Sequence, residues 1–499
     1  MRAAEHGGVA LVQETGAAED SGTIDGAREI VDEAEGIIDG VARGAEEGGT
    51  PAPAAAPRGE VWSDSRVAHM LERLTSDFVL DNTYREQHLS LTASENYPSK
   101  LVRMLGGGLQ GGFYEFAPPY ASEPGEWSFP DSGANASLVA KLTGIGRQLF
   151  EAATFDWRPN GGSVAEQAVL LGTCGRGDGF VHFAHKDGGH FALESLAAAA
   201  GVNTYHLPMV DRTLLVDVER LATLVSEHPE IKLVILDQSF KLRWQPLAQI
   251  RAALPEGVFL AYDASHDGAL IAGGVLPQPT LLGADAVHGN THKTIAGPQK
   301  AYVAFRDADH PKLRQVSDWV CPQMQSNSHA ELIAPMYVAL SEVALYGHDY
   351  ARQIVANAKA LAGALHEEGV RVSGESFGFT ETHQVHVITG SAADALRLAL
   401  GDLARAGIRT TNIEVPGSNG LHGLRLGVQA MTRRGLREAE MREVGRLVAR
   451  VVLRRAEPAA VRAEVADLLQ HFGLDRLAYS FDEYVDSPAA ARLLGEVFR

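Results

Sequence analysis

Hydrophobic residues follow two different spacings between about residues 135 and 310, and the two spacings alternate along the chain. Short apolar runs bounded by glycine or polar residues are typical of buried strands. They predict strands at 179–184, 204–207, 232–236, 258–262, 284–287 and 301–305. Segments with apolar residues every three to four positions predict helices at 163–174, 192–200, 216–227 and 247–253. This alternation predicts an α/β fold with a largely parallel, doubly wound sheet.

The flanking segments have other patterns. Residues 65–90 predict a helix with one buried face. Its apolar positions are Val67, Met70, Leu71, Leu74, Phe78 and Leu80. Residues 330–367 predict a long helix that bridges two domains, and 370–455 predict a smaller α+β domain with strands at 384–389 and 424–428 and helices at 392–406 and 438–454.

These patterns divide the chain into five expected parts. They are an acidic disordered tail at 1–60, an N-terminal helical segment at 61–105, a large domain at 106–330, the bridging helix with the small domain at 331–455, and a helical extension at 456–499. The tail has 13 acidic and four basic residues and ends in a Pro-Ala run, which is typical of disorder. Its apolar residues also recur at helical spacing, so a transient helix that docks on a partner is the alternative interpretation.

Charge and composition exclude several classes of protein. The net charge of −19 argues against binding to nucleic acid or to an anionic membrane surface, since both need clustered Lys and Arg. The sequence has no apolar run as long as the roughly 20 residues of a membrane span, and no secretory signal. Its two cysteines, Cys174 and Cys321, lack metal-ligand spacing, so we expect no metal site and a reducing, cytoplasmic location.

One lysine stands out at the end of a predicted strand. Lys293 follows the strand 284–287 and precedes the turn at Gly297 and Pro298. Open α/β sheets bind ligands at the carboxyl ends of their strands. A partly desolvated amine there becomes neutral more easily and can form a Schiff base with an aldehyde such as pyridoxal phosphate. A loop lysine without a role is the alternative from this stretch alone.

Four further features precede Lys293 at strand or helix ends. Gly162 and Ser163 begin a helix, where backbone N–H groups suit a phosphate. His190 follows two glycines and is placed to stack on a cofactor ring, Ser239 to bond its phenolic oxygen, and Asp263 to keep a pyridine nitrogen protonated. Each has an ordinary structural alternative, but their order on successive strand ends favours a pyridoxal phosphate site.

A fifth feature lies in the small domain. Arg425, in the stretch 423–427, is a natural clamp for a substrate carboxylate, although a surface-strand arginine would have the same pattern.

Several stretches together resemble the serine hydroxymethyltransferase branch of fold-type I pyridoxal phosphate enzymes over about residues 65–455. They are Ala93-Ser-Glu-Asn-Tyr97, Gly188-Gly-His190, Asp263-Ala-Ser-His266, Thr291-His-Lys-Thr294 with Gly297-Pro298, and Gly423-Leu-Arg-Leu-Gly427 with Thr432-Arg-Arg-Gly435. The resemblance implies Lys293 as the Schiff-base lysine and an obligate homodimer.

The resemblance also implies individual roles. Asp263 would contact the pyridine nitrogen, His190 the ring, and Gly162 and Ser163 the phosphate. The cofactor would also contact Ser239, His266 and His292. Ser94 and Arg425 would hold the amino acid, and Tyr114 and Gly297 of one subunit would complete the partner's site.

Other stretches depart from hydroxymethyltransferases where that family binds folate. The segment 114–130 lacks the expected acidic residue and tyrosine pair, the loop 413–422 is short, and 319–329 is not glycine-rich. These segments are similar to L-threonine transaldolases of the obafluorin-pathway type, over residues 84–484. That family cleaves L-threonine to acetaldehyde and transfers the glycyl unit to a second aldehyde.

The expected reaction is therefore retro-aldol cleavage of L-threonine followed by aldol addition to an acceptor aldehyde, which gives a β-hydroxy-α-amino acid for natural-product biosynthesis. His190 or a glutamate of the 115–126 loop is the candidate base, and Trp127 and Phe129 are candidates to exclude water. The alternatives are a folate-dependent serine/glycine hydroxymethyltransferase, a plain threonine aldolase, and a non-catalytic binding scaffold.

Overall fold

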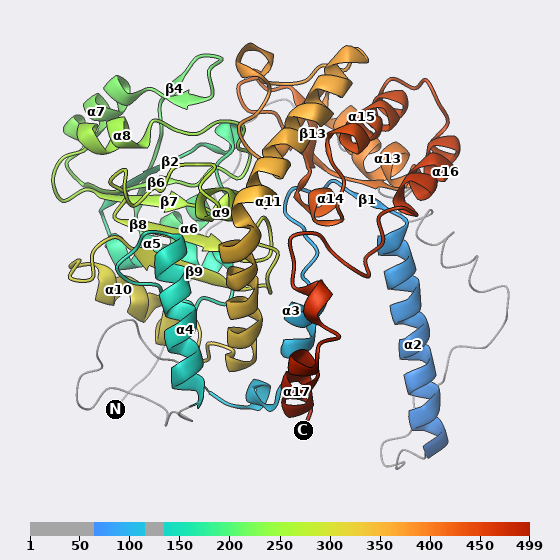
Figure 1. Cartoon of the computed structure of the whole chain (residues 1–499). Helices are drawn as coiled ribbons and strands as arrows, with labels where there is room; N and C mark the ends of the chain where they lie inside the picture. Colours follow the sequence, from blue (N-terminus) through green and yellow to red (C-terminus); the bar gives the residue numbers. More distant parts are fainter. Residues whose placement is uncertain (1–63, 115–133) are drawn as a thin grey trace, which may run out of the picture. The chain divides into compact units, whose positions relative to one another are not determined.

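The computed structural model describes residues 64–114 and 134–499, and Figure 1 draws the remaining chain as a grey trace. Contacts group Ser63–Arg499 into one compact unit. The predicted disordered tail lies outside the described residues, as does most of the loop 106–130. The other predicted domain boundaries remain predictions.

A six-stranded sheet forms the centre of this unit (Figure 1). Its strand order is β3-β2-β6-β7-β8-β9. The strands are β2 (Gly179–His182), β3 (Asn203–His206), β6 (Ile231–Leu236), β7 (Phe259–Asp263), β8 (Ala286–Asn290) and β9 (Ala301–Phe305). The first five in this order run parallel, and β9 is antiparallel to β8. The predicted α/β class with a mostly parallel sheet is confirmed.

Both faces of the sheet are buried, and successive residues alternate between them. In β6, Leu233 and Ile235 face one apolar cluster while Val234 and Leu236 face the other. The helices α5 (Gly162–Thr173), α6 (Ala192–Ala200) and α10 (Leu313–Asp318) contribute to the first cluster. The second receives α4 (Ala134–Leu149), α7 (Val218–Glu227), α8 (Leu247–Ala253) and α9 (Gly268–Ala272). Burial on both faces explains why the strands read as continuous apolar runs.

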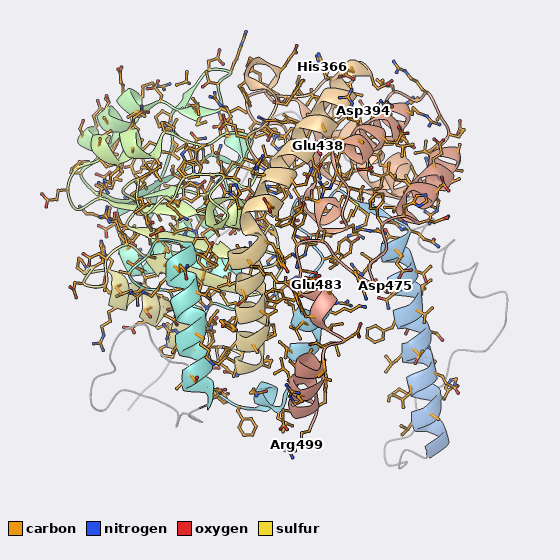
Figure 2. The ribbon with its side chains drawn as sticks, in the orientation of Figure 1. His366, Asp394, Glu438, Asp475, Glu483 and Arg499 are labelled. Atoms are coloured by element: carbon orange, nitrogen blue, oxygen red, sulfur yellow. The ribbon has the colours of Figure 1, made fainter. Side chains whose placement is uncertain are left out.

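The long helix α11 (Ile333–Glu367) begins three residues later than predicted, after a short 3-10 turn at Ala330–Leu332. It packs against α4 and α9 of the sheet region and against α15 (Glu438–Val452). His366, near the end of α11, and Glu438, the first residue of α15, are exposed (both labelled in Figure 2). One helix therefore connects the cores of the two predicted domains.

A second, antiparallel sheet has the order β10-β13-β12. Its strands are β10 (Gln384–Gly390), β12 (Thr411–Glu414) and β13 (His422–Gly427). The segment β1 (Leu89–Ser90) pairs in parallel with β11 (Ile408–Arg409), and Thr92 bridges to Leu426. This pairing fixes the residues after β1, including Ser94, beside β13.

Two of the predicted helices form, but each differs from its prediction in one respect. The helix expected at 392–406 is divided into α12 (Ala392–Leu396), a π-helical turn at Arg397–Asp402 and α13 (Leu403–Arg405). Gly401 lies in that turn, and glycine weakens a regular helix. The helix α2 (Asp64–Glu86) exists, but its described side chains are all exposed. Leu71 is 54% exposed and Phe78 67% exposed, because no described element of the chain covers the apolar stripe.

The remaining elements are short or terminal. They are α3 (Lys100–Leu105), the hairpin β4 (Met209–Val210) with β5 (Leu215–Val216), α14 (Gln429–Arg433), α16 (Pro458–Leu469) and α17 (Pro488–Val497). Among the described residues, no helix combines the length and apolar character needed to cross a bilayer.

Candidate active site

The carboxyl ends of β6, β7 and β8 bring three polar segments together. Asp237 follows β6, Asp263 ends β7 and Lys293 follows β8. Asp263 is the register partner of His288, so the lysine loop begins directly beside the carboxylate. Open α/β folds bind ligands at the carboxyl ends of their parallel strands.

The amine of Lys293 is held inside the chain. Its Nζ lies 3.2 Å from Nε2 of His266, and its backbone carbonyl accepts a 2.6 Å hydrogen bond from the Asn96 amide. Burial lowers the pKa of Lys293 from 10.5 to about 8, although Asp263 opposes this change. A solvated loop lysine does not fit this environment.

Asp263 is a buried carboxylate that stays ionised. Burial alone would raise its pKa, but the interactions with His288, Lys293 and the Ser265 side chain lower it below the usual value. The Ser265 backbone N–H also donates to this carboxylate at 2.7 Å. A permanent negative charge at this point is what a protonated ring nitrogen requires.

His190 is fixed by two carboxylates. Its backbone N–H donates to Asp237 Oδ2 at 2.9 Å, and its Nδ1 lies 2.9 Å from Glu166 Oε2. Burial lowers the pKa of His190, but Glu166 outweighs burial and the net pKa is raised. Burial raises the pKa of Glu166 to about 7, against the opposing effect of His190. The two groups thus form a close pair of titratable side chains inside the site.

Glu166 is a site residue that was not predicted from the sequence. It lies three residues after Ser163 on α5, and this spacing puts both side chains on one side of the helix. The spacing was the available signal, but only the tertiary structure shows that Glu166 meets His190.

Three histidines behind Lys293 are kept neutral. Nδ1 of His266 lies 3.4 Å from Nε2 of His383 and 3.2 Å from the Gln384 amide. Burial lowers the pKa of His266 well below its usual value and that of His383 to about 3. The pKa of His292, beside Lys293 in sequence, is lowered to about 4 by burial. Neutral His266 can accept a hydrogen bond from the Lys293 amine.

Gly162, the first residue of α5, lies against two polar side chains. A Cβ at this position would be 3.3 Å from Asn290 Nδ2 and 3.5 Å from Ser265 Oγ. The preceding Gly161 provides no side-chain cap, and Ser163 is exposed. The start of α5 therefore offers backbone N–H groups and a hydroxyl next to Ser265 and Asn290, which the sequence analysis also missed.

Arg425 in β13 reaches across from the second sheet. Its Nη1 donates to the Ser239 carbonyl at 3.1 Å, and its guanidinium lies 5.1 Å from the centre of the Phe240 ring. Burial lowers the pKa of Arg425 to about 10, so it remains cationic. Among the described residues, no carboxylate forms an ion pair with Arg425. Its charge is thus available to an anionic ligand.

Four other predicted site residues are Ser94, His292, Gly297 and Tyr114. Ser94, His292 and Gly297 line a cavity of about 400 Å³ together with Tyr97. Tyr114 is 49% exposed and is the last described residue before the gap at 115–133. The structure thus brings Ser94, His292 and Gly297 to one cavity, which Lys293 itself does not line, whereas Tyr114 lies at the surface of this chain.

Buried polar atoms without a hydrogen-bond partner among the described residues concentrate at this centre. They include Glu166 Oε1, both ring nitrogens of His288, Asn290 Oδ1, His292 Nδ1 and Arg425 Nε. Unpaired buried polar groups are costly, and such a concentration is typical of a site that binds a polar molecule.

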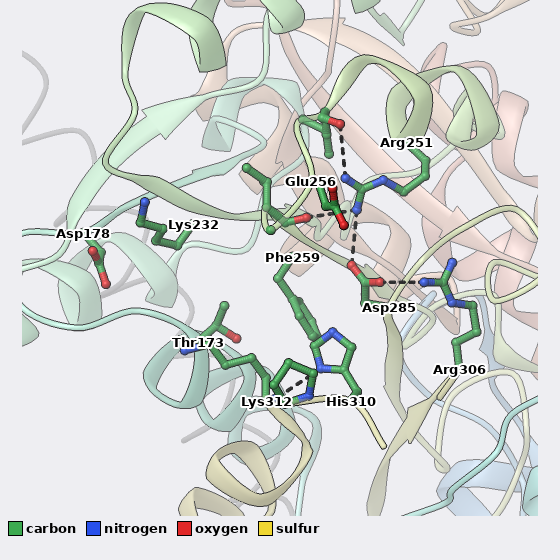
Figure 3. Close-up of a pocket in the computed structure, with 14 residues that line it drawn as sticks. Thr173, Asp178, Lys232, Arg251, Glu256, Phe259, Asp285, Arg306, His310 and Lys312 are labelled. Atoms are coloured by element: carbon green, nitrogen blue, oxygen red, sulfur yellow. Dashed lines mark hydrogen bonds and ion pairs between the residues drawn. The ribbon is translucent and has the colours of Figure 1, made fainter. Parts of the chain in front are cut away.

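A second cavity, of about 590 Å³, lies at the amino ends of β6, β7 and β8 (Figure 3). Two of its cations, Arg251 and Arg306, bond to Asp285 at 3.3 and 3.0 Å. Arg251 also donates to backbone carbonyls, including that of Val258 at 2.9 Å. These groups are satisfied within the chain, so this cavity is less suited to chemistry than the smaller one.

Comparisons with known proteins agree with the geometry. Residues 72–448 match the family model described as serine hydroxymethyltransferase. A serine hydroxymethyltransferase from Archaeoglobus fulgidus is 36% identical over 70% of this chain and 79% of the relative. One from Methanosphaera stadtmanae is 31% identical over 84% of this chain and 97% of the relative.

A solved structure is more similar still. The crystal structure of L-threonine transaldolase from Pseudomonas fluorescens, in its internal aldimine state, is 53% identical to this chain with a TM-score of 0.86. The likeness covers 87% of this chain and 99% of that one.

Proposed function

Since the chain belongs to the serine hydroxymethyltransferase family and is a pyridoxal phosphate-dependent transferase, we propose that it is an L-threonine transaldolase. It cleaves L-threonine to acetaldehyde and transfers the remaining glycyl unit to a second aldehyde, which gives a β-hydroxy-α-amino acid for natural-product biosynthesis. One observation carries this proposal: identity to an L-threonine transaldolase is 53%, against 36% and 31% for the hydroxymethyltransferases above.

The residues present fit pyridoxal phosphate. The start of α5 with Gly162 and Ser163 would hold the phosphate, supported by Ser265 and Asn290. Asp263 would pair with the ring nitrogen, and Lys293 would hold the aldehyde carbon. Four further side chains would contact the cofactor, namely His190, Ser239, His266 and His292. When bound, the cofactor supplies an aldehyde for amines and a ring that withdraws electrons from the bonds at Cα.

Lys293 contributes an amine that is neutral far more often than an exposed one. At a given neutral pH, a pKa of about 8 instead of 10.5 makes the neutral fraction roughly 300-fold larger. Neutral His266, 3.2 Å away, orients this amine without competing for its proton.

Substrate orientation falls to Arg425 and Ser94. The guanidinium forms a charge-assisted contact with the threonine carboxylate, and the hydroxyl of Ser94 assists. Because Arg425 already donates to the Ser239 carbonyl, it is held in place before substrate binds. Binding by the carboxylate leaves the β-hydroxyl free to face a base.

The threonine β-hydroxyl must lose its proton before the Cα–Cβ bond breaks. His190 is the proposed base, with Glu166 as the group that holds and returns the proton, because their contact is 2.9 Å and the pKa of Glu166 is about 7. The other candidate, a glutamate of the 115–126 loop, lies outside the described residues, as do Trp127 and Phe129. We propose that these two aromatic residues keep water from the cleaved substrate.

A homodimer is part of the proposal. One face of α2 exposes Val67, Met70, Leu71, Leu74 and Phe78. A continuous apolar face of this size is unusual on an isolated subunit and is typical of an interface. A second copy of the chain is the proposed cover, with its Tyr114 and Gly297 turn beside the site of the first.

The deciding experiment gives purified enzyme L-threonine with a panel of acceptor aldehydes and follows acetaldehyde and product amino acids. We expect acetaldehyde release that depends on the acceptor and new β-hydroxy-α-amino acids. Release of free glycine with no acceptor product would identify a threonine aldolase. Fast methylene transfer from serine to tetrahydrofolate, without aldehyde exchange, would identify a hydroxymethyltransferase.

A further inference from the structure

Three side chains outside the cofactor site meet at the edge of the main sheet. They are His182 of β2, Glu194 of α6 and His206 of β3. Oε1 of Glu194 lies 3.1 Å from His206 Nε2 and 3.6 Å from His182 Nε2. The three atoms all lie within 4.8 Å of one another.

Backbone pairing brings the two histidines together. His182 and His206 are register partners in the parallel pair β2–β3, and their ring centres are 5.4 Å apart. The helix α6 connects these strands, and Glu194 lies in its first turn. The arrangement therefore depends on regular elements rather than on a loop.

His182 is prepared to act as a ligand. It is 1% exposed, and its Nδ1 lies 3.1 Å from the Asp237 carboxylate. A carboxylate on Nδ1 favours a proton there, which leaves Nε2 to coordinate a metal when the ring is neutral. Among the described residues, no hydrogen-bond donor or acceptor pairs with that Nε2. The Glu194 oxygen lies 3.6 Å from it.

The donor set and its spacing suit a first-row transition metal. Two imidazole nitrogens and one carboxylate are common zinc ligands, at about 2.0–2.2 Å from the metal. Tetrahedral ligands at that distance are roughly 3.3 Å apart, and the separations of 3.1 and 3.6 Å bracket this value. Glu194 and His206 are about half exposed, at 47% and 48%, so an ion can reach the site from solvent.

We propose that His182, Glu194 and His206 bind a divalent transition-metal ion of the zinc class, with water in the remaining position. The site is distinct from the cofactor centre but is connected to it. Asp237 accepts the backbone N–H groups of Phe183 and His190 at 3.0 and 2.9 Å in addition to its contact with His182. A bound ion would hold the carboxylate that positions His190.

The test measures binding of Zn²⁺ to the untagged holoenzyme by calorimetry, with bound zinc after dialysis counted by mass spectrometry. The variants are His206→Ala and Glu194→Gln, both half exposed. The matched control is His366→Ala, because His366 (labelled in Figure 2) also has its Nε2 3.6 Å from a carboxylate, that of Glu375, in an exposed pair.

We expect about one zinc ion per chain in the parent, affinity at least tenfold weaker in both variants, and no change in His366→Ala. Circular dichroism checks that each variant is folded. Equal zinc binding by the parent and His206→Ala, or no binding by the parent, would overturn the proposal. The result does not depend on which reaction the enzyme catalyses.

Discussion

Replacing Arg425 by glutamine should weaken threonine binding without lowering the free energy of unfolding. Lowering the pKa of this guanidinium from 12.5 to about 10 corresponds to roughly 3 kcal/mol of burial cost in the free enzyme. The substitution removes that cost but also loses the bond to the Ser239 carbonyl and the contact with Phe240. These contacts contribute about 1–2 kcal/mol together. We therefore expect the free energy of unfolding to stay unchanged or to rise by about 1–2 kcal/mol.

The same change should severely weaken use of threonine. Removing one partner of a buried charge pair costs about 3–5 kcal/mol, which is roughly a 10²- to 5 × 10³-fold loss in kcat/KM. Arg434 is the matched control, because its guanidinium donates to the backbone carbonyls of Phe472 and Glu86 at 2.7 and 3.1 Å. Arg434→Gln should lower stability and leave the KM for threonine nearly unchanged.

The assay combines thermal unfolding of each variant with acetaldehyde release over a range of threonine concentrations. If Arg425→Gln lost several kcal/mol of stability, Arg425 would be a structural residue. If its kcat/KM for threonine stayed within threefold of the parent, the carboxylate would bind elsewhere. Either result would refute the assignment.

Other predictions concern the lysines and the subunit interface. After borohydride reduction, intact mass should show cofactor fixed to the parent but not to Lys293→Ala, with peptide mapping to identify the lysine; fixation in the variant would contradict the assignment. Leu74→Lys combined with Phe78→Glu should convert a dimer to a monomer in light scattering, and a parent that is already monomeric would refute the interface. Burial lowers the pKa of Lys300 to about 7, so the unfolded chain binds the extra proton between that pH and about 10.4. The free energy of unfolding should therefore rise with pH across that window, by up to about 1.4 kcal/mol per pH unit. In chemical unfolding, Lys300→Met should show a smaller rise with pH than the parent. Equal slopes of unfolding free energy against pH in the two proteins would exclude this titration.

The sequence alone determined the main sheet and the order of its chemical groups. Apolar runs identified the strands because both faces are buried, and each strand end then marked a position for Lys293, Asp263 or His190. The carboxyl ends of parallel strands all lie on the same side of the sheet. Residues that follow these strands could therefore be predicted from the sequence to lie near one another.

Only the tertiary structure decided which side chains touch. The contact of Glu166 with His190, the approach of Asn290 to Gly162 and the pairing of His182 with His206 depend on strand register and helix rotation. The lowered pKa of Lys293 depends on burial in three dimensions, and spacing does not specify burial.

The helix α2 also shows that the sequence does not specify burial. Its apolar stripe was visible in the sequence, but the expected burial was absent because no described part of the chain covers it. Periodicity determines which face of a helix is apolar. The surrounding structure determines whether that face is buried, and by which element. The reason is that the hydrophobic effect is non-directional, so any apolar surface that covers the face stabilises it.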